Sequence, residues 1–398
     1  MKRSKIITTT ILLVSFISLF NDIASEMLYP VMPVYLKSIG FSVLLIGILE
    51  GLAEAVAGLS KGYFGRLSDV TGKRIPFVRI GYAMSVISKP LMVAFVYPLW
   101  IFFTRTLDRL GKGVRTSARD AILSDETTPD HKGKVFGFHR GFDTLGAAIG
   151  PVIALIFLYF YPRQYKWLFL LAVMPGVIAI SLSFLVKDKR ENRKKNTGRP
   201  GFLSFLAYWK RSSSPYKKLV MGLLVFTLFN SSDVFLLLAL KNQGYSDTHM
   251  IGFYIFYNLV YALLSYPVGI LADKIGLKHT LVAGLLIFAV VYAGMGWSGG
   301  FWFFGLLFFF YAIYAASTEG ISKALITNLA GQSETATAIG FYTSMSSLFT
   351  MLASSLAGWI WFAFGPKTMF LVSAAGVFAV VIYFVLFSFP GNKQPENR

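Results

Sequence analysis

A stretch of opposite charges at helical spacing, Arg105 to Asp120, comes directly after an apolar run. Its sequence, "RTLDRLGKGVRTSARD", holds four arginines, one lysine and two aspartates and follows "YPLWIFFT". On a helix, residues separated by three, four or seven positions share a face, so the charges form a stripe. Its members are Arg105, Arg109, Lys112 and Arg119, with Asp108 and Arg115 beside them. Arginine presents a planar fork that binds carboxylate or phosphate through two bonds, which predicts a site for an anionic substrate.

Further ionisable residues lie in the apolar segments around this stripe. Most are pairs three or four residues apart, so each pair lies on one helix face. The substrate-binding candidates are Arg105, Arg109, Lys112, Arg115, Arg140, Glu319 and Lys323. The candidates for proton exchange are Asp22, Glu26, Glu50, Glu54, Asp108, Asp143 and Asp233. Burial removes water from a charged carboxyl group and so favours its protonated form, whereas an approaching arginine favours the charged form. Such a group can therefore bind and release a proton. The alternative is that these pairs are architectural salt bridges.

The composition indicates that membrane helices must position these residues. The chain has 398 residues, of which 55% are hydrophobic and 14% charged, against about 25% charged in soluble domains. Apolar runs of about 20 residues recur, the length that crosses a hydrocarbon core of roughly 30 Å. We expect an all-α integral membrane protein with twelve helices, at 8–36, 43–64, 76–97, 99–124, 134–161, 165–187, 217–240, 249–272, 279–297, 301–326, 336–363 and 367–389. An arginine at a helix centre costs about 2.5–3.5 kcal/mol to insert, so the stripe must face an aqueous cavity or buried partners.

The basic residues predict the orientation of the chain. Residues 187–218 contain eleven Lys/Arg against two acidic residues, whereas loops on the opposite side, such as "GWSGGFW", hold almost none. The positive-inside rule then places both termini in the cytoplasm, and we expect the cytoplasmic (inner) membrane of a bacterium. The net charge of +19 reflects this topology and attraction to anionic lipids, so no nucleic-acid partner is expected. Lys89 and Lys241 are expected to extend to the membrane interface.

The two halves of the chain repeat each other. "GRLSDVTGKR" (65–74) and "GILADKIGLK" (269–278) share a pattern of glycines, aspartate and a basic residue at a displacement of 204 residues, and "LFND" at 19–22 is echoed by "LFNSSD" at 228–233. Internal repeats of this kind are typical of transporter bodies. We therefore expect two pseudo-symmetric six-helix bundles, 1–186 and 217–390, a basic cytoplasmic linker, 187–216, and a short cytoplasmic tail, 391–398. Within the linker, "FLSFLAYW" is either a short amphipathic piece on the inner membrane surface or a tether.

These motifs resemble those of the major facilitator superfamily (MFS), and the resemblance covers essentially the whole chain. The loop with Gly65, Asp69, Gly72 and Arg74, and its copy with Gly269, Asp273 and Gly276, match the family's gating motif. Gly137, Gly146, Gly150 and Pro151 resemble its antiporter signature in the fifth helix, except that Ala154-Leu155 replace a trailing Gly-Gly. Asp22 followed by "YPVMP" resembles the twelve-helix drug and metabolite branch. The resemblance implies the MFS fold and alternating access.

Asp69 has two predicted partners in this loop. It can accept hydrogen bonds from the first amides of a neighbouring helix, or pair with a basic group at the cytoplasmic end of the fourth helix, where Arg119 is the nearest candidate. We hypothesise that this contact forms when the cytoplasmic mouth closes, and so holds the outward-facing state.

The function expected from these residues is secondary active transport. The sequence contains no G-x-x-x-x-G-K-[ST], H-E-x-x-H or G-x-S-x-G motif and no cysteine, so we expect no enzymatic activity, cofactor or metal. We expect a proton-coupled monomer that moves a small organic anion, such as a polycarboxylate, a carboxylate siderophore or an organophosphate, in either direction. The first alternative is a multidrug or metabolite efflux antiporter. A sensor that does not transport and a lipid transporter remain further alternatives.

Overall fold

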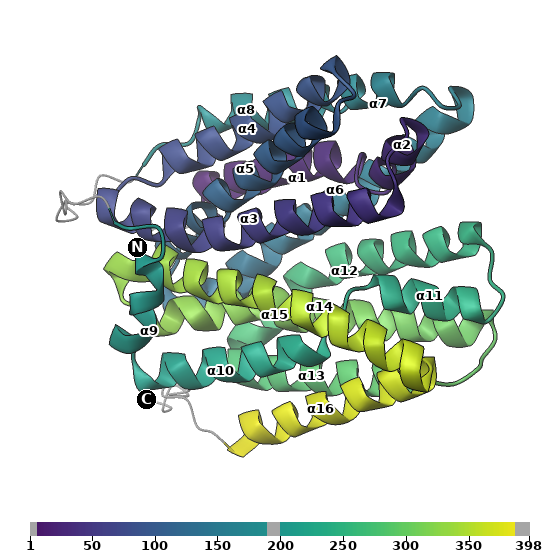
Figure 1. Cartoon of the computed structure of the whole chain (residues 1–398). Coiled ribbons are helices and arrows are strands. Elements are labelled where there is room, and N and C mark those ends of the chain that lie inside the picture. The colour runs from purple at the N-terminus through teal and green to yellow at the C-terminus, as the bar shows by residue number, and fades with distance from the viewer. Residues whose placement is uncertain (1–5, 189–199, 387–398) are drawn as a thin grey trace. The chain divides into compact units, whose positions relative to one another are not determined.

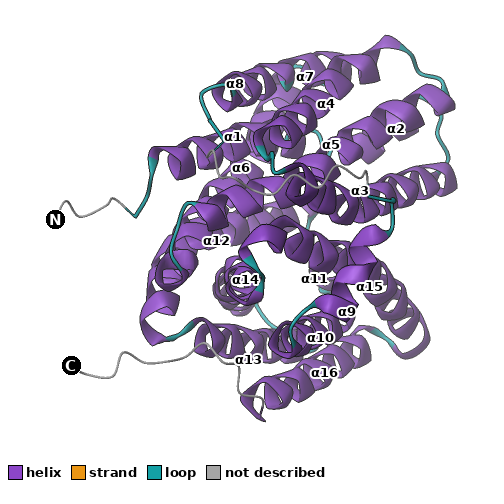
Figure 2. Ribbon diagram, turned by 90° about the vertical axis from the view of Figure 1, so that its left-hand side faces the viewer, coloured by secondary structure: helices purple, strands orange, loops and turns teal. Residues whose placement is uncertain are grey.

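A computed structural model describes residues 6–188 and 200–386, and every regular element in these ranges is a helix (Figure 2). The predicted tail, 391–398, and most of the basic run in the predicted linker lie outside the described residues. The side chain of Glu50 also lies outside the described part of the chain.

The chain divides into two compact units that exchange short segments. Unit 1 comprises Met1–Thr127, Phe142–Lys210 and Gly331–Ser347, and unit 2 comprises Thr128–Gly141, Arg211–Ala330 and Leu348–Arg398. Two helices are shared: α6 (Lys132–Phe160) begins in unit 2 and continues in unit 1, whereas α15 (Thr335–Phe364) begins in unit 1 and continues in unit 2. The predicted division at the linker concerns the duplicated halves of the sequence and stays a prediction.

Unit 1 is built around the charged helix α5 (Pro98–Asp125), which packs on α3 (Val43–Thr71) and α4 (Ile75–Ala94) (Figure 1). Glycines allow this close packing, because a Cβ at Gly113 would lie 2.6 Å from Ser60 Cβ, and one at Gly111 would lie 2.6 Å from the Gly81 carbonyl. The other elements of unit 1 are α1 (Thr9–Glu26), α2 (Met32–Ser38), α7 (Tyr165–Leu171), α8 (Val173–Ser183), η2 (Ser204–Ala207), most of α9 (Tyr208–Arg211) and η3 (Gln332–Glu334). The short η1 (Pro129–His131), just before α6, belongs to unit 2.

Unit 2 has its core where α13 (Leu277–Met295) packs on α14 (Phe301–Leu329) and α16 (Pro366–Leu386). Its other helices are α10 (Ser214–Phe229), α11 (Val234–Asn242) and α12 (Asp247–Ile275). Aromatic rings fill the interior, and Phe288 stacks on Tyr292 with centroids 3.9 Å apart.

Three of the predicted helices are each divided into two in the structure. The first, 8–36, separates into α1 and α2, because Pro30 and Pro33 lack the N–H groups that would continue the helical ladder. The sixth, 165–187, separates into α7 and α8 near Pro175 for the same reason. The seventh, 217–240, separates into α10 and α11 at the polar run 230–233, whose side chains compete for backbone hydrogen bonds.

Within the described residues, ten helical stretches are long and apolar enough to cross a membrane. The helix α5 is not among them, although it is 28 residues long, because it carries many charged residues. The chain is therefore an integral membrane protein with multiple apolar helices, and the count of twelve stays a prediction.

The aromatic part of the linker packs on unit 1. The ring of Phe205 is fully buried against Gly62 of α3, and Trp209 stacks on Phe341 of α15 with centroids 5.6 Å apart. Phe202 and Leu203 stay exposed. One side of this short segment is therefore anchored to protein, and the other keeps the apolar exposure of an amphipathic piece.

Candidate functional site

The charged stripe of α5 is largely buried in unit 1, and its arginines face carboxylates of the protein. Arg105 Nη1 lies 3.6 Å from Asp108 Oδ2, and Arg109 Nη1 lies 3.6 Å from Glu54 Oε2 on α3. Glu54 is about half exposed, whereas the side chain of Arg109 is 12% exposed. Lys112 is exposed, and its charge acts on the carboxyl groups of Asp22 and Glu26 of α1. The stripe therefore has partners within the protein, as the cost of placing its charges in a membrane requires.

Arg115 is the arginine of the stripe with neutral partners. It donates to Ser85 Oγ at 2.7 Å, and its guanidinium lies over the ring of Tyr82, 4.6 Å from the centroid. These contacts with α4 place Arg115 in a packing role inside unit 1, away from the more exposed Arg109 and Lys112.

Lys89 differs from its prediction. It was expected to reach the membrane interface, but it is buried, donates to the Ser85 carbonyl at 2.8 Å and lies 3.7 Å from Asp108 Oδ1. The buried carboxylate of Asp108, on the neighbouring helix, holds the ammonium group inside the unit because an unpaired charge there would be costly. Asp108 thus has two cationic neighbours, Lys89 and Arg105.

A second charged group joins α1, α5 and α6. Arg119 lies 3.0 Å from Asp120 and 3.4 Å from Asp143 Oδ1, and it donates to Ser18 Oγ at 2.9 Å. The carboxyl group of Asp22 on α1 lies close enough to Asp143 for the two charges to interact. Two neighbouring carboxyl groups repel each other when both are charged, so a proton on one of them relieves the repulsion. Asp22 and Asp143, both predicted proton-exchange residues, therefore form a carboxyl pair beside Arg119.

Asp69 caps a helix, and its basic partner differs from the predicted one. Its carboxylate accepts the backbone N–H of Thr337 at 2.6 Å and the hydroxyl of Thr337 at 2.7 Å, at the first turn of α15. Arg74 Nη1 lies 3.0 Å from Asp69 and its Nε 2.8 Å from Asp125. The expected contact with helix N-terminal amides is confirmed. The expected pairing with Arg119 is wrong, because Arg119 is engaged by Asp120 and Asp143.

The copy of the loop makes the same contact within unit 2. Asp273 accepts the backbone N–H groups of Gly133 and Lys134, both at 2.8 Å, at the first turn of α6. Gly65 and Gly269, one turn before the two aspartates, leave no room for a Cβ: the carbonyl of Ala336 faces Gly65, and that of Gly133 faces Gly269. The glycines therefore bring each aspartate within reach of its helix.

The remaining motif glycines serve turns and close packing. Gly72 and Gly276 end α3 and α12 with φ of 65° and 102°, which glycine adopts without steric cost. In α6, the backbone of α12 lies against Gly137, and the backbone of α1 lies against Gly146 and Gly150. Pro151 follows inside the same helix. The antiporter-like pattern thus marks the surfaces where α6 packs closely in each unit.

Unit 2 contains an acidic and aromatic cluster of its own. Arg140 of α6 pairs with Glu319 of α14 and donates to Tyr261 Oη at 2.7 Å, while Lys323 lies one turn beyond Glu319. Asp233 accepts the Tyr311 hydroxyl at 2.7 Å and forms no ion pair within the described residues. The charge of Asp233 also acts on the hydroxyl groups of three further tyrosines, which are Tyr257, Tyr292 and Tyr314.

Sequence reasoning missed most of this tyrosine cluster. Tyrosine and phenylalanine are abundant throughout the chain, so their presence alone did not single out these residues. A usable signal was the helical spacing of Tyr257 with Tyr261, and of Tyr311 with Tyr314, opposite an intramembrane aspartate.

The two helix breaks lie at equivalent positions of the repeat. The interruption at residues 27–31 divides the first predicted helix of the first half, and the interruption at 230–233 divides the first predicted helix of the second half. Each break adjoins charged candidates, Asp22 and Glu26 in unit 1 and Asp233 in unit 2. Tyr29, in the first break, lies under the guanidinium of Arg109, 5.8 Å from the ring centroid. Interrupted helices at corresponding positions of two repeats are the feature that best indicates a substrate site in such proteins.

Comparison with known proteins supports the predicted family. The model of the Major Facilitator Superfamily matches residues 14–257 and 219–398. An uncharacterized MFS-type transporter of Methanocaldococcus jannaschii is 32% identical over 372 residues, covering 92% of this chain and 91% of that protein. Citrate exporter 1 of Aspergillus niger is 27% identical over 177 residues, covering 44% of this chain and 33% of the exporter. The crystal structure of the human organic anion transporter MFSD10 has a TM-score of 0.80 at 15% identity and covers 94% of this chain and 98% of its own, which shows the shared fold.

Proposed function

The chain belongs to the Major Facilitator Superfamily of membrane transporters, and we propose that it moves a small organic anion by proton-coupled alternating access. A polycarboxylate or a carboxylate siderophore is the class of substrate that fits. The charge pattern of the sequence favours the inner membrane of a bacterium with both termini in the cytoplasm. Its partners in this proposal are the substrate, protons and membrane lipids, and the protein acts as a monomer.

One observation carries this proposal: arginines on α5 are paired with carboxylates of the protein. Arg109 faces Glu54, and Glu54 is exposed enough to be displaced. An incoming carboxylate competes for the same guanidinium fork, and Lys112 offers a second cation one turn along the helix. Substrate binding at Arg109 then releases Glu54 from its cation. Without that cation the carboxyl group of Glu54 binds a proton more readily, which couples the two ligands.

The carboxyl pair Asp22 and Asp143 supplies a place for the transported proton. The two neighbouring carboxyl groups can share one proton, and Arg119 Nη1 lies 3.4 Å from Asp143 Oδ1. A shift of Arg119 toward or away from Asp143 changes how strongly the pair holds that proton. We therefore assign proton exchange to Asp22 and Asp143, and substrate contact to Arg109 and Lys112.

The contacts of the two loop aspartates support the proposed conformational cycle. A transporter of this kind alternates between inward-open and outward-open states by movement of one half against the other. Asp69 of α3 accepts hydrogen bonds from the beginning of α15, and Asp273 of α12 accepts them from the beginning of α6. In our proposal these contacts exist in one state and break in the other.

The substrate class also receives support from the partial relative. The exporter of Aspergillus niger that matches 44% of this chain bears citrate in its name. Citrate is a polycarboxylate, which is the chemistry that the cationic face of α5 is suited to bind. We take citrate as the first compound to test.

Proton movement in reconstituted vesicles tests both parts of the proposal. The full-length protein is placed in liposomes that contain a pH-sensitive dye, and citrate is added outside without an imposed pH gradient. We expect citrate to enter with a change of internal pH that an ionophore abolishes. Asp22→Asn should retain citrate exchange across the membrane while losing the pH change. Citrate exchange without proton movement in the unaltered protein refutes the coupling, and the absence of flux for every organic anion tested refutes the substrate class.

A second candidate function is export of lipophilic cations, which the tyrosine cluster favours. Asp233 lies among aromatic rings and forms no ion pair within the described residues, and aromatic rings with a carboxylate are suited to organic cations. If this function holds, liposomes will take up lipophilic cations against a proton gradient and Asp233→Asn will abolish that flux. Citrate flux without cation flux decides for the first proposal.

A further inference from the structure

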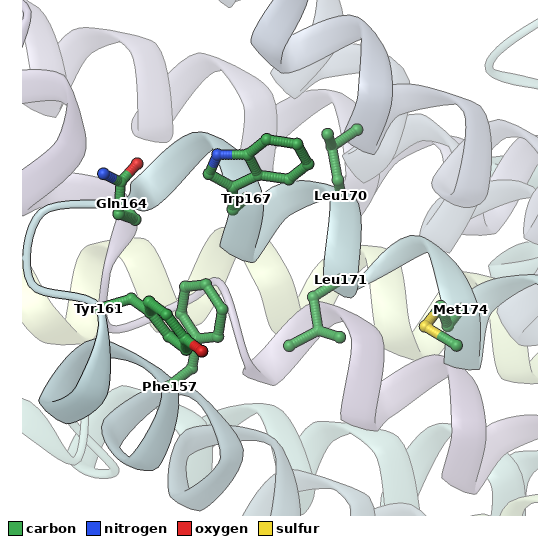
Figure 3. A pocket seen from close by; sticks show the side chains of 7 residues that line it. All are labelled: Phe157, Tyr161, Gln164, Trp167, Leu170, Leu171 and Met174. Atoms are coloured by element: carbon green, nitrogen blue, oxygen red, sulfur yellow. The ribbon is translucent and has the colours of Figure 1, made fainter.

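An apolar pocket lies in unit 1 where α6 ends and α7 begins (Figure 3). None of its lining residues belongs to the charged helix α5. Its volume is about 560 Å³, within the range of roughly 300–1,000 Å³ that is usual for ligand pockets. Aromatic side chains, among them Tyr161 and Trp167, form one part of its wall, and Leu170 and Met174 extend it along α7 and α8. Gln164 adds an amide at the turn between the helices.

The pocket is open to the surroundings of the protein. Trp167 is 63% exposed and Met174 is 64% exposed, so two large apolar side chains remain uncovered at its wall. In a membrane protein such a surface meets lipid, and tryptophan and tyrosine are favoured where the hydrocarbon adjoins the headgroups. The pocket therefore has the lining expected for a hydrocarbon chain near the membrane interface.

Two cations stand beside this lining. Arg163 and Lys166 are both exposed, and within the described residues neither forms an ion pair or a hydrogen bond through its side chain. Lys166 lies one turn before Leu170 on the same face of α7, and Arg163 precedes Gln164 in the turn. Arg163 has a left-handed φ of 63°, which is uncommon for a residue with a side chain. Positive charge is thus available at the rim of the pocket.

The position of these cations is unusual for the predicted topology. With both termini in the cytoplasm, the turn between α6 and α7 lies on the outer side of the membrane, where few Lys or Arg residues are expected. Arg163 and Lys166 depart from that pattern only three residues apart. Their presence is accounted for if they bind an anion at the outer interface.

We propose that this pocket binds an anionic phospholipid, with an acyl chain between α6 and α7 and the phosphate against Arg163 and Lys166. Charge complementarity selects the headgroup, because basic side chains at a membrane surface attract anionic lipids. The apolar lining selects a chain-bearing ligand over a free phosphate. This site shares no residue with the proposed substrate site on α5, so a test of lipid binding is independent of the transport proposal.

Native mass spectrometry of the full-length protein in detergent tests the proposal. The protein is titrated with phosphatidylglycerol, with phosphatidylcholine as the headgroup control and inorganic phosphate as the free anion. We expect tighter binding of phosphatidylglycerol than of phosphatidylcholine. Arg163→Gln and Lys166→Gln should each weaken phosphatidylglycerol binding by roughly fivefold and leave phosphatidylcholine binding unchanged.

Matched variants make the outcome specific to this pocket. Lys166→Arg keeps the charge and should keep the lipid selectivity, while Lys73→Gln removes an exposed lysine of unit 1 in the turn between α3 and α4 and should have no effect. Quenching of Trp167 by brominated phosphatidylglycerol, measured as the difference from Trp167→Phe, reports the chain in the pocket. Equal binding of both lipids, selectivity that survives both glutamine substitutions, or displacement of the lipid by inorganic phosphate at equal concentration would overturn the proposal.

Discussion

Asp69 and Thr337 are joined by two hydrogen bonds, because the carboxylate accepts the backbone N–H of Thr337 at 2.6 Å and its hydroxyl at 2.7 Å. The first amides of a helix have no partner inside the helix, and the helix dipole favours a negative charge at this end. Asp273 makes the equivalent contact with the first amides of α6. The repeat in the sequence therefore preserves a physical contact as well as a pattern of residues.

Asp69→Asn should loosen the first turn of α15. Asparagine keeps one acceptor oxygen but loses the charge, and it leaves Arg74 without the more buried of its two carboxylate partners. Hydrogen bonds to charged groups contribute about 1.5–3 kcal/mol, so amides at 335–340 should exchange with deuterium at least about tenfold faster. Thr337→Val removes only the hydroxyl and should have a smaller effect. Unchanged exchange in Asp69→Asn would show that the charge does not hold this helix.

Gly65→Ala should weaken the same contact through packing alone. The carbonyl of Ala336 occupies the space that a Cβ would need at Gly65, so α3 and the beginning of α15 must separate. Overpacking of this kind costs roughly 1–3 kcal/mol. Thermal unfolding in detergent measures the loss. Gly51→Ala, in the same helix, is the matched control, because nothing lies within 4 Å of its Cβ position, and it should be neutral or stabilising by up to about 1 kcal/mol. Equal melting temperatures for the two variants would contradict the argument.

The sequence predicted those features that depend on local pattern. The membrane class, the family and the capping role of Asp69 follow from apolar length, from the repeated loop and from the chemistry of helix ends. The partner of Arg119 was not predictable, because helical spacing gives the face of a residue but not which of several carboxylates on other helices it meets. Asp120 and Asp143 engage Arg119, which leaves Asp69 to Arg74.

Lys89 and the interrupted helices show the same limit. A lysine near a helix end usually extends to the interface, but here Asp108 on the packed neighbour binds it inside the unit. Hydropathy alone reads 8–36 and 217–240 as continuous, since the prolines and the polar run are too short to lower the average. The two breaks both lie in the first predicted helix of a half and next to charged residues. This shared position is the feature of the sequence that could have indicated the division.

Arg119→Gln should destabilise the protein strongly, and Asp143→Asn should restore part of the loss. Removing the guanidinium leaves Asp120 and Asp143 buried without the cation that both contact. Breaking a buried ion pair from one side costs about 3–5 kcal/mol. The double variant no longer buries the charge of Asp143, so its melting temperature in detergent should lie between those of Arg119→Gln and the unaltered protein. A double variant less stable than Arg119→Gln would show that Asp143 contributes through contacts other than its charge.

Arg109→Gln should weaken substrate binding without a comparable loss of maximal rate. If the substrate carboxylate replaces Glu54 at this guanidinium, losing the charged donor removes about 1.5–3 kcal/mol, which raises KM for citrate by roughly tenfold or more. Because the contact is made in the bound state before the conformational change, the maximal rate of flux should change little. Lys112→Gln should act in the same direction, and Lys112→Arg should retain affinity. The double variant Arg109→Gln with Glu54→Gln separates charge from packing: if KM returns to the original value, Arg109 serves only to neutralise Glu54 and does not contact the substrate.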